Sequence, residues 1–116
     1  KMCVRANIDK NQDTIPHLAL FVHFMQGRND TFLSWPFSGK ITISVIDQNP
    51  DVNKRTHMKE TLKSSPNLAA FQRPTTPKNV KGFGYTEFLS IAALENGSYL
   101  MEDTLVVRVQ VFDDFR

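Results

Sequence analysis

The sequence predicts an all-β protein, a single antiparallel β-sandwich domain that occupies residues 1–116. Three observations support this prediction. Segments in which apolar and polar side chains alternate recur along the chain, and a period of two residues is typical of strands. Short turns rich in Asn, Asp, Gly and Pro separate these segments. Residues 91–95 have the composition of a helix, and they make a single turn.

The first strands are predicted from their side-chain patterns. Residues 2–7 alternate between apolar and polar positions, so the chain opens directly in a strand. Residues 9–14 are a polar turn, and residues 17–26 form a long second strand. Because both faces of this second strand are apolar, we expect it to be a central strand that is covered on both sides.

The middle of the chain contains the clearest strand. Residues 27–30 form a turn, and Trp35-Pro36-Phe37 follows as an apolar plug. Residues 40–47 are rich in β-branched side chains and alternate strictly, which favours a strand. Residues 48–55 are a polar loop. Residues 57–62 fit either a short strand or a helical turn, and the pattern leaves both open.

The last third of the chain is interrupted by turn residues. Residues 64–67 break the chain, and residues 71–80 contain two prolines, so they form an extended connector and not a sheet interior. Residues 82–89 resume a strand, residues 91–95 are the helical turn, and residues 105–112 are the final strand.

Composition excludes several functions. The 14 basic and 12 acidic residues are mixed along the chain, so we expect no nucleic-acid partner. The longest apolar stretches, residues 18–22 and 105–107, are far shorter than the roughly 20 residues that span a bilayer, so we expect no membrane insertion. A lone cysteine, Cys3, cannot form an internal disulfide, which favours a reducing compartment and a cytoplasmic location.

The residue pattern predicts no catalytic residues, no metal site and no cofactor. His17 and His23 would lie roughly 20 Å apart on one extended strand, and no second cysteine completes a zinc site. The paired carboxylates are adjacent in sequence and do not make a facing acid–base pair. No nucleophile elbow or phosphate-binding glycine loop occurs. We therefore expect a domain that is not an enzyme.

The segment Lys81-Gly82-Phe83-Gly84-Tyr85 is the strongest functional candidate. In a strand, the lysine and the two rings project to one side and the glycines to the other. Glycine weakens a strand unless another backbone comes close, and the upstream prolines suit a sheet edge. An incoming peptide could pair with such an edge while the rings form pockets. Alternatively, both rings are core residues and the glycines are bulge positions, and the pattern does not separate these possibilities.

Several short motifs follow one another over nearly the whole chain: Leu20-Phe21-Val22-His23, Met25-Gln26-Gly27, Trp35-Pro36-Phe37, Asp47-Gln48, Phe71-Gln72-Arg73-Pro74, Lys81-Gly82-Phe83-Gly84-Tyr85 and Asp103-Thr104-Leu105. Together they resemble the C-terminal domain of the TNF-receptor-associated factors, the TRAF or MATH domain, and look most like its sixth member. The resemblance implies an eight-stranded sandwich whose first two strands are absent here. Those strands lie outside these residues, or another chain supplies them, or the domain exposes unprotected edges.

The resemblance also implies a peptide-binding adaptor domain for the tails of receptors and signalling adaptors, in innate immune and TNF-receptor-superfamily signalling. These tails would carry a Pro-x-Glu-x-x-(aromatic or acidic) motif and add as a strand to the sheet edge. The implied parent protein is a homotrimer through a coiled coil outside this chain, and its RING ubiquitin-ligase module and zinc fingers lie outside it as well. The implied binding residues are Arg5, Ala69, Ala70, Lys81, Gly82, Phe83, Gly84 and Tyr85.

Each implied residue has a role carried over from the family. Phe83 and Tyr85 would line the pocket for the peptide proline. Backbone N–H groups near Ala69 and Ala70 would receive the glutamate, and Lys81 would pair with its charge.

At the far end of the site, Arg5 would stack on the terminal aromatic side chain of the peptide. Val80 stands where the similar relative has proline, so the edge there can pair differently.

Two alternatives stay open. MATH domains also occur in secreted meprin-type proteases and in deubiquitinases, where they recruit substrates or support oligomerisation. The sequons at Asn29 and Asn96 favour the secreted protease, although we expect both to be ordinary turn residues. Cys3 and the segment 81–85 favour the adaptor. A purely structural module that self-associates through the same edge is the other alternative.

Overall fold

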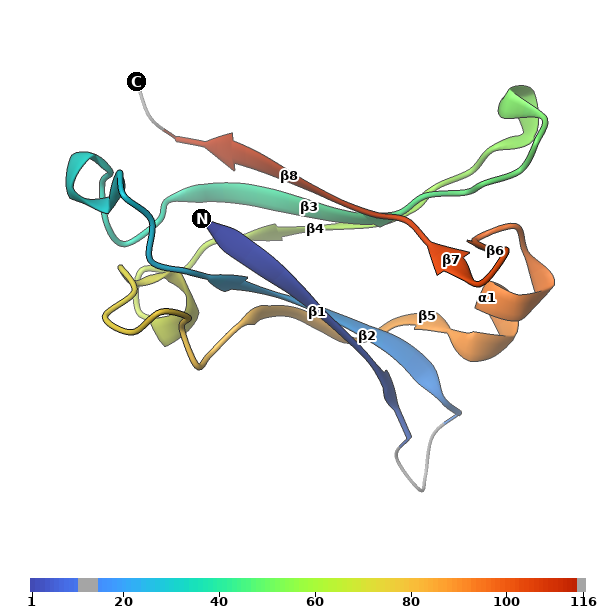
Figure 1. The fold of residues 1–116 in the computed structure, drawn as a ribbon, viewed down its shortest axis with the longest axis horizontal. Coiled ribbons are helices and arrows are strands. Elements are labelled where there is room, and N and C mark those ends of the chain that lie inside the picture. The colour runs from blue at the N-terminus through green and yellow to red at the C-terminus, as the bar shows by residue number, and fades with distance from the viewer. Residues whose placement is uncertain (11–14, 115–116) are drawn as a thin grey trace.

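Two three-stranded antiparallel sheets pack face to face in the computed structural model, which describes residues 1–10 and 15–114 (Figure 1). One sheet has the order β1-β2-β5 and the other β4-β3-β8. The strands are β1 (Met2–Asp9), β2 (His17–Phe24), β3 (Gly39–Val45), β4 (Met58–Lys63), β5 (Phe83–Ser90) and β8 (Val107–Asp113). The smaller elements are β6 (Leu100–Met101), β7 (Thr104–Leu105), α1 (Ile91–Asn96) and the 3-10 helices η1 (Asp30–Phe32), η2 (Val52–Lys54) and η3 (Ala69–Phe71). The predicted antiparallel sandwich is confirmed.

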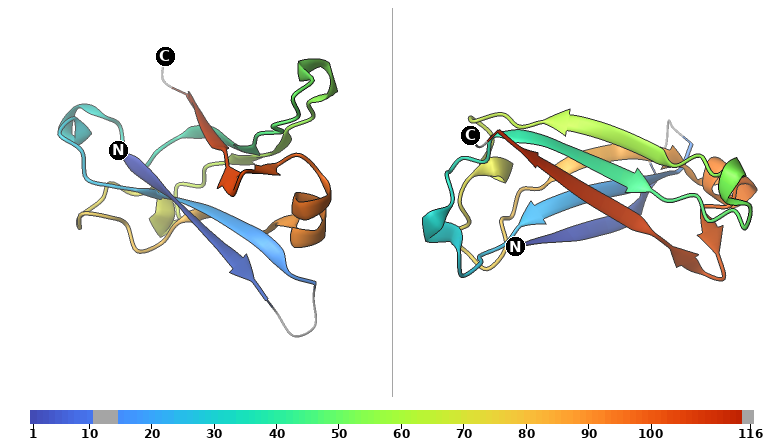
Figure 2. Two further views of the ribbon diagram at one scale, coloured as in Figure 1. Left: turned by 45° about the vertical axis from the view of Figure 1, so that its right-hand side comes forward. Right: turned by 90° about the horizontal axis from the view of Figure 1, so that it is seen from above.

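Seen from above, the sheets lie one over the other with β4 over β5 on one flank and β8 over β1 on the opposite flank (Figure 2). The central position predicted for residues 17–26 is confirmed, because β2 pairs with β1 on one side and β5 on the other. Leu20 and Val22 are fully buried, and Ala19 on the other face of β2 is only 1% exposed. This burial explains why both faces of the strand are apolar.

Pairing with a neighbour settles residues 57–62, whose pattern left strand and helix open. They form β4, in which Leu62 pairs with Ile41 and Met58 pairs with Val45 of β3. These two partners in β3 have no exposed surface, so Met58 and Leu62 face the core.

Some boundaries differ from the sequence prediction. β2 ends at Phe24, and Met25 makes an isolated bridge to Lys78 instead of continuing the strand. The last strand begins at Val107, because Leu105 belongs to the β6–β7 hairpin. The strand predicted at 82–89 runs one residue later, as β5. Of the turn predicted at 9–14, residue 9 ends β1, and residues 11–14 lie outside the described residues.

A row of aromatic rings forms one end of the core. Phe24 lies 5.2 Å from Phe83 and 5.6 Å from Phe37, measured between ring centroids. Phe71 stacks on Phe83 at 4.9 Å and also contacts Phe37. Trp35 meets the edge of Phe24 at 5.9 Å, which confirms the predicted apolar plug. These contacts attach η3 and the plug to the sheet that carries β5.

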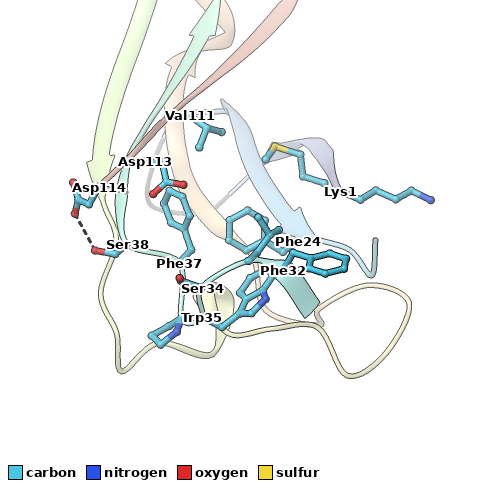
Figure 3. Close-up of a pocket in the computed structure, with 13 residues that line it drawn as sticks. Lys1, Phe24, Phe32, Ser34, Trp35, Phe37, Ser38, Val111, Asp113 and Asp114 are labelled. Carbon is cyan, nitrogen blue, oxygen red and sulfur yellow. Dashed lines mark hydrogen bonds between the residues drawn. The ribbon is translucent and has the colours of Figure 1, made fainter. Parts of the chain in front are cut away.

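The flank formed by β1 and β8 is uncovered, because each of these strands is the outer strand of its sheet. Val4 and Val111 pair with the buried residues Val22 and Ile41, so they face the interior, yet both are 43% exposed. A cleft of about 650 Å³ opens at one end of this flank, with Phe24, Phe37 and Trp35 in its wall (Figure 3). Within residues 1–10 and 15–114, each sheet therefore ends in an unpaired outer strand at this flank.

Candidate functional site

The candidate segment 81–85 leads into the outer strand of its sheet. β5 pairs with β2 through Phe83–Val22, Gly84–Phe21 and Tyr85–Leu20. No strand pairs with the other side of β5 among residues 1–10 and 15–114. The predicted edge position is confirmed, and the free N–H and C=O groups of this edge can pair with an added strand.

The two glycines of this segment allow β5 to approach β2 closely. Gly84 has φ = +156°, and a Cβ atom there would lie 2.0 Å from the carbonyl oxygen of Leu20. A Cβ atom on Gly82 would lie 2.7 Å from Nε2 of His23. The backbone that comes close is therefore β2 of the same sheet. The register shift of this strand pair falls between Leu18 and Leu20, beyond both glycines, so they are not bulge positions.

The two aromatic side chains of the segment have different environments. Phe83 is 6% exposed and stacks on Phe71, so it is a core residue, as the alternative in the sequence analysis expected. Tyr85 is only partly buried, and its ring lies 6.0 Å from that of Phe88. Burial raises the pKa of the Tyr85 phenol, and the carboxylate of Glu60 on β4 raises it further. Only Tyr85 is directly accessible from the flank where β4 lies over β5.

Unused donors lie close to this edge. Ala69 and Ala70 form the first turn of η3, whose position is set by the Phe71–Phe83 stack. No backbone hydrogen bond within residues 1–10 and 15–114 uses the N–H of Ala69 or Ala70. Lys81 is exposed and makes no salt bridge to any residue that the structure describes. These groups could bind a carboxylate.

Arg5 comes from β1, two strands away from β5, and lies over the outer face of the sheet. Its guanidinium carbon is 4.5 Å from the centroid of the Phe21 ring, a cation–π contact. Arg5 pairs with Phe21, and Phe21 pairs with Gly84, so the three residues form one row across the sheet. Because Gly84 has no side chain, this row ends in bare backbone at the edge of β5.

Sequence reasoning missed His23, whose ring accepts a hydrogen bond from Arg5 of this row. The ring is 4% exposed, its Nε2 atom is 3.2 Å from Nε of Arg5, and its Nδ1 atom is 2.8 Å from the carbonyl oxygen of Asn79. In the sequence, His23 was rejected as a metal ligand and otherwise appeared only in the motif Leu20-Phe21-Val22-His23. Its link to Arg5 depends on strand register, so no sequence signal identified it.

The described residues contain no group of three or more His, Cys, Asp or Glu side chains placed to hold a metal ion. Within the same residues, no helix has the length and apolar character needed to cross a membrane. The accessible chemistry of the site is thus backbone hydrogen bonding, one lysine, one tyrosine and a stacked arginine.

Comparison with known proteins gives a consistent result. The family described as TRAF/meprin, MATH domain matches residues 1–108. TNF receptor-associated factor 6 of Rattus norvegicus is 42% identical over 99% of this chain, and that of Homo sapiens is 40% identical over 99%. The chain spans 22% of the length of each of these relatives. The structure of Notothenia coriiceps TRAF5 has a TM-score of 0.79 and 34% identity, covering 96% of this chain and 54% of that chain. The chain belongs to the TRAF/meprin MATH domain family.

Proposed function

We propose that this chain is a non-catalytic, peptide-binding adaptor domain that receives the tails of TNF-family and Toll/interleukin-1-type receptors and their adaptors. The observation that carries the proposal is the uncovered edge of β5. This strand begins at Phe83, within the segment from Lys81 to Tyr85, and lies close to the unused N–H groups of η3. An extended peptide on this edge gains main-chain hydrogen bonds from β5 and side-chain contacts from its neighbours. Similarity to TNF receptor-associated factor 6 supports the same function.

The expected ligand motif is Pro-x-Glu-x-x-(aromatic or acidic). Tyr85 contacts the proline, and buried Phe83 supports the Tyr85 side of the pocket from within the core. The N–H groups of Ala69 and Ala70 donate hydrogen bonds to the glutamate carboxylate, and Lys81 supplies the opposite charge.

The last position of the ligand lies over the row formed by Arg5, Phe21 and Gly84. One face of the Arg5 guanidinium rests on Phe21, and Arg5 is an exposed residue that can receive an aromatic side chain. A ligand carboxylate at the same position pairs with the charge of Arg5.

A single site of this kind binds weakly, because a short peptide buries little surface. Useful strength comes from multivalency in a parent protein that is a cytoplasmic homotrimer through a coiled coil outside this chain. Ubiquitin-ligase activity, if the parent has it, belongs to modules beyond these residues.

Calorimetry with a Pro-x-Glu-x-x-Phe peptide tests the proposal. Tyr85→Ala should weaken binding by about 2 kcal/mol or more, since an accessible anchoring tyrosine would be lost from the site. Phe112→Ala is the matched control, because Phe112 is a 52% exposed ring on β8 in the other sheet. Phe83→Ala does not test binding by itself, because removing this core side chain costs about 3–5 kcal/mol of folding stability.

The outcomes separate the alternatives. Unchanged affinity in Tyr85→Ala would show that the ligand does not use this edge. If the wild-type chain binds no peptide and sediments as a dimer that Tyr85→Ala dissociates, the edge serves self-association instead.

A further inference from the structure

We infer that His23 is a positioning residue for Arg5, and that its hydrogen bond orients the Arg5 guanidinium for recognition of the last ligand residue. The inference rests on the proposed function, because it assigns a specificity role within the same site. It follows from the hydrogen bonds of one buried imidazole, from the register of β1 and β2, and from the space left by Gly82.

The partners of His23 determine its protonation state. The carbonyl oxygen of Asn79, 2.8 Å from Nδ1, can only accept a hydrogen bond, so Nδ1 must carry the proton. The Nε–H of Arg5, 3.2 Å from Nε2, can only donate, so Nε2 must offer its lone pair. Only the neutral ring with the proton on Nδ1 satisfies both partners.

This hydrogen bond selects one position of the Arg5 side chain. Arg5 is exposed and bears a long flexible stem, which would otherwise sample many rotamers. His23 holds its Nε, the Phe21 ring supports its guanidinium, and Asn7 accepts from one terminal nitrogen at 3.2 Å. The guanidinium plane is thereby oriented before a ligand arrives, which reduces the entropic cost of binding.

Gly82 connects the same imidazole to the ligand-binding edge. A Cβ atom at this position would lie 2.7 Å from Nε2 and 2.9 Å from Cε1 of His23. The missing side chain therefore leaves the room in which the ring reaches Arg5. Asn79, which accepts from the other ring nitrogen, lies in the segment that leads into Lys81 and Gly82.

The binding test uses two peptides, Pro-x-Glu-x-x-Phe and the same peptide ending in Ala, with the full 116-residue chain. At about pH 7.5 the Phe peptide should bind about 3- to 5-fold more tightly, the gain expected from one exposed cation–π contact. In His23→Phe, whose ring offers no acceptor to Arg5, this ratio should fall to about one. An unchanged ratio in that variant would overturn the inference, since changes elsewhere in the site affect both peptides alike.

Three variants separate positioning from a purely structural role. His23→Gln can accept from Arg5 and donate to Asn79, so the Phe preference should persist. His23→Phe keeps a ring but offers no acceptor, so the preference should disappear while the Ala peptide binds as before. In Arg5→Ala the preference is absent, and adding His23→Phe should change nothing further, because the two residues act through one contact.

A measurement without ligand keeps the inference testable if no peptide binds. Nitrogen-15 spectra should show the proton on Nδ1 of His23 at about pH 7.5, and the Arg5 Nε–H signal should shift in His23→Phe, which removes its acceptor. That shift should be much smaller in His23→Gln, which keeps an acceptor. An Arg5 signal indifferent to His23 would refute the positioning role, whereas a coupled signal without any peptide binding would refute only the proposed adaptor function.

Discussion

Substitution of Gly84 by alanine should destabilise this domain severely, because the strand pair β2–β5 leaves no room for a side chain. The new Cβ atom would lie 2.0 Å from the carbonyl oxygen of Leu20 and 2.8 Å from Cα of Phe21. Both are backbone atoms of the central strand, so neither can rotate away. The φ of +156° adds conformational strain for any residue with a Cβ atom.

The magnitude follows from two contributions. A non-glycine residue in this region of φ costs about 1–3 kcal/mol. Forcing backbone shifts in a packed interior costs a further 1–3 kcal/mol, roughly. We expect a loss of about 4 kcal/mol, a large part of the roughly 5–15 kcal/mol by which domains are stable. With a urea slope of about 1.5 kcal/mol per M, the unfolding midpoint should fall by about 2–3 M.

Equilibrium urea unfolding followed by the fluorescence of Trp35 measures this change. Gly27→Ala is the matched control, because a Cβ atom at Gly27 meets no heavy atom closer than 3.4 Å. That variant should unfold at the wild-type midpoint or slightly above it, since alanine restricts the unfolded chain. If Gly84→Ala and Gly27→Ala unfold at the same midpoint, the close approach of β5 to β2 is wrong.

Two further predictions concern buried polar groups. The carboxylate of Asp47 accepts from the backbone N–H of Thr56 and of Asn49, and these bonds lower the pKa of Asp47. Because these bonds favour the ionised carboxylate, they stabilise the folded state at pH values above the ordinary aspartate pKa of about 3.9. This stabilisation should be lost as the pH falls below that value. Asp47→Asn should therefore flatten the acid limb of a plot of urea midpoint against pH. Ser44 has no exposed surface, and its Oγ has no partner among the described residues, so Ser44→Ala should raise stability by about 1 kcal/mol; a lower urea midpoint would contradict this.

Local pattern was sufficient for most of the sandwich. The alternation in β3 predicted which residues face the core, and Ile41, Ile43 and Val45 are indeed completely buried. An apolar pattern on both faces predicted that β2 is central, and between its two neighbouring strands even Ala19 and His23 on the outer face are buried. Residues 57–62 were ambiguous, since a short mixed segment becomes a strand only through the partner it finds in β3.

Local pattern was insufficient where two segments distant in sequence share one site. Phe83 and Tyr85 look equivalent in the sequence, yet stacking on Phe71 buries Phe83, while the edge position leaves Tyr85 partly accessible. The row of Arg5, Phe21 and Gly84 exists only because two strand registers bring these residues opposite one another. Register is a property of paired strands, and a shift of one residue would reverse every face.

The amino-acid sequence by itself determined the class of fold, the family and the segment that borders the open edge, because periodicity and short motifs are local properties. The tertiary structure alone decided what the glycines and His23 do. Gly82 and Gly84 make room for β2 and for an imidazole, and that imidazole reaches an arginine 18 residues away in sequence. Such contacts depend on how the strands are packed, and strand packing is set by the whole core and not by any one segment.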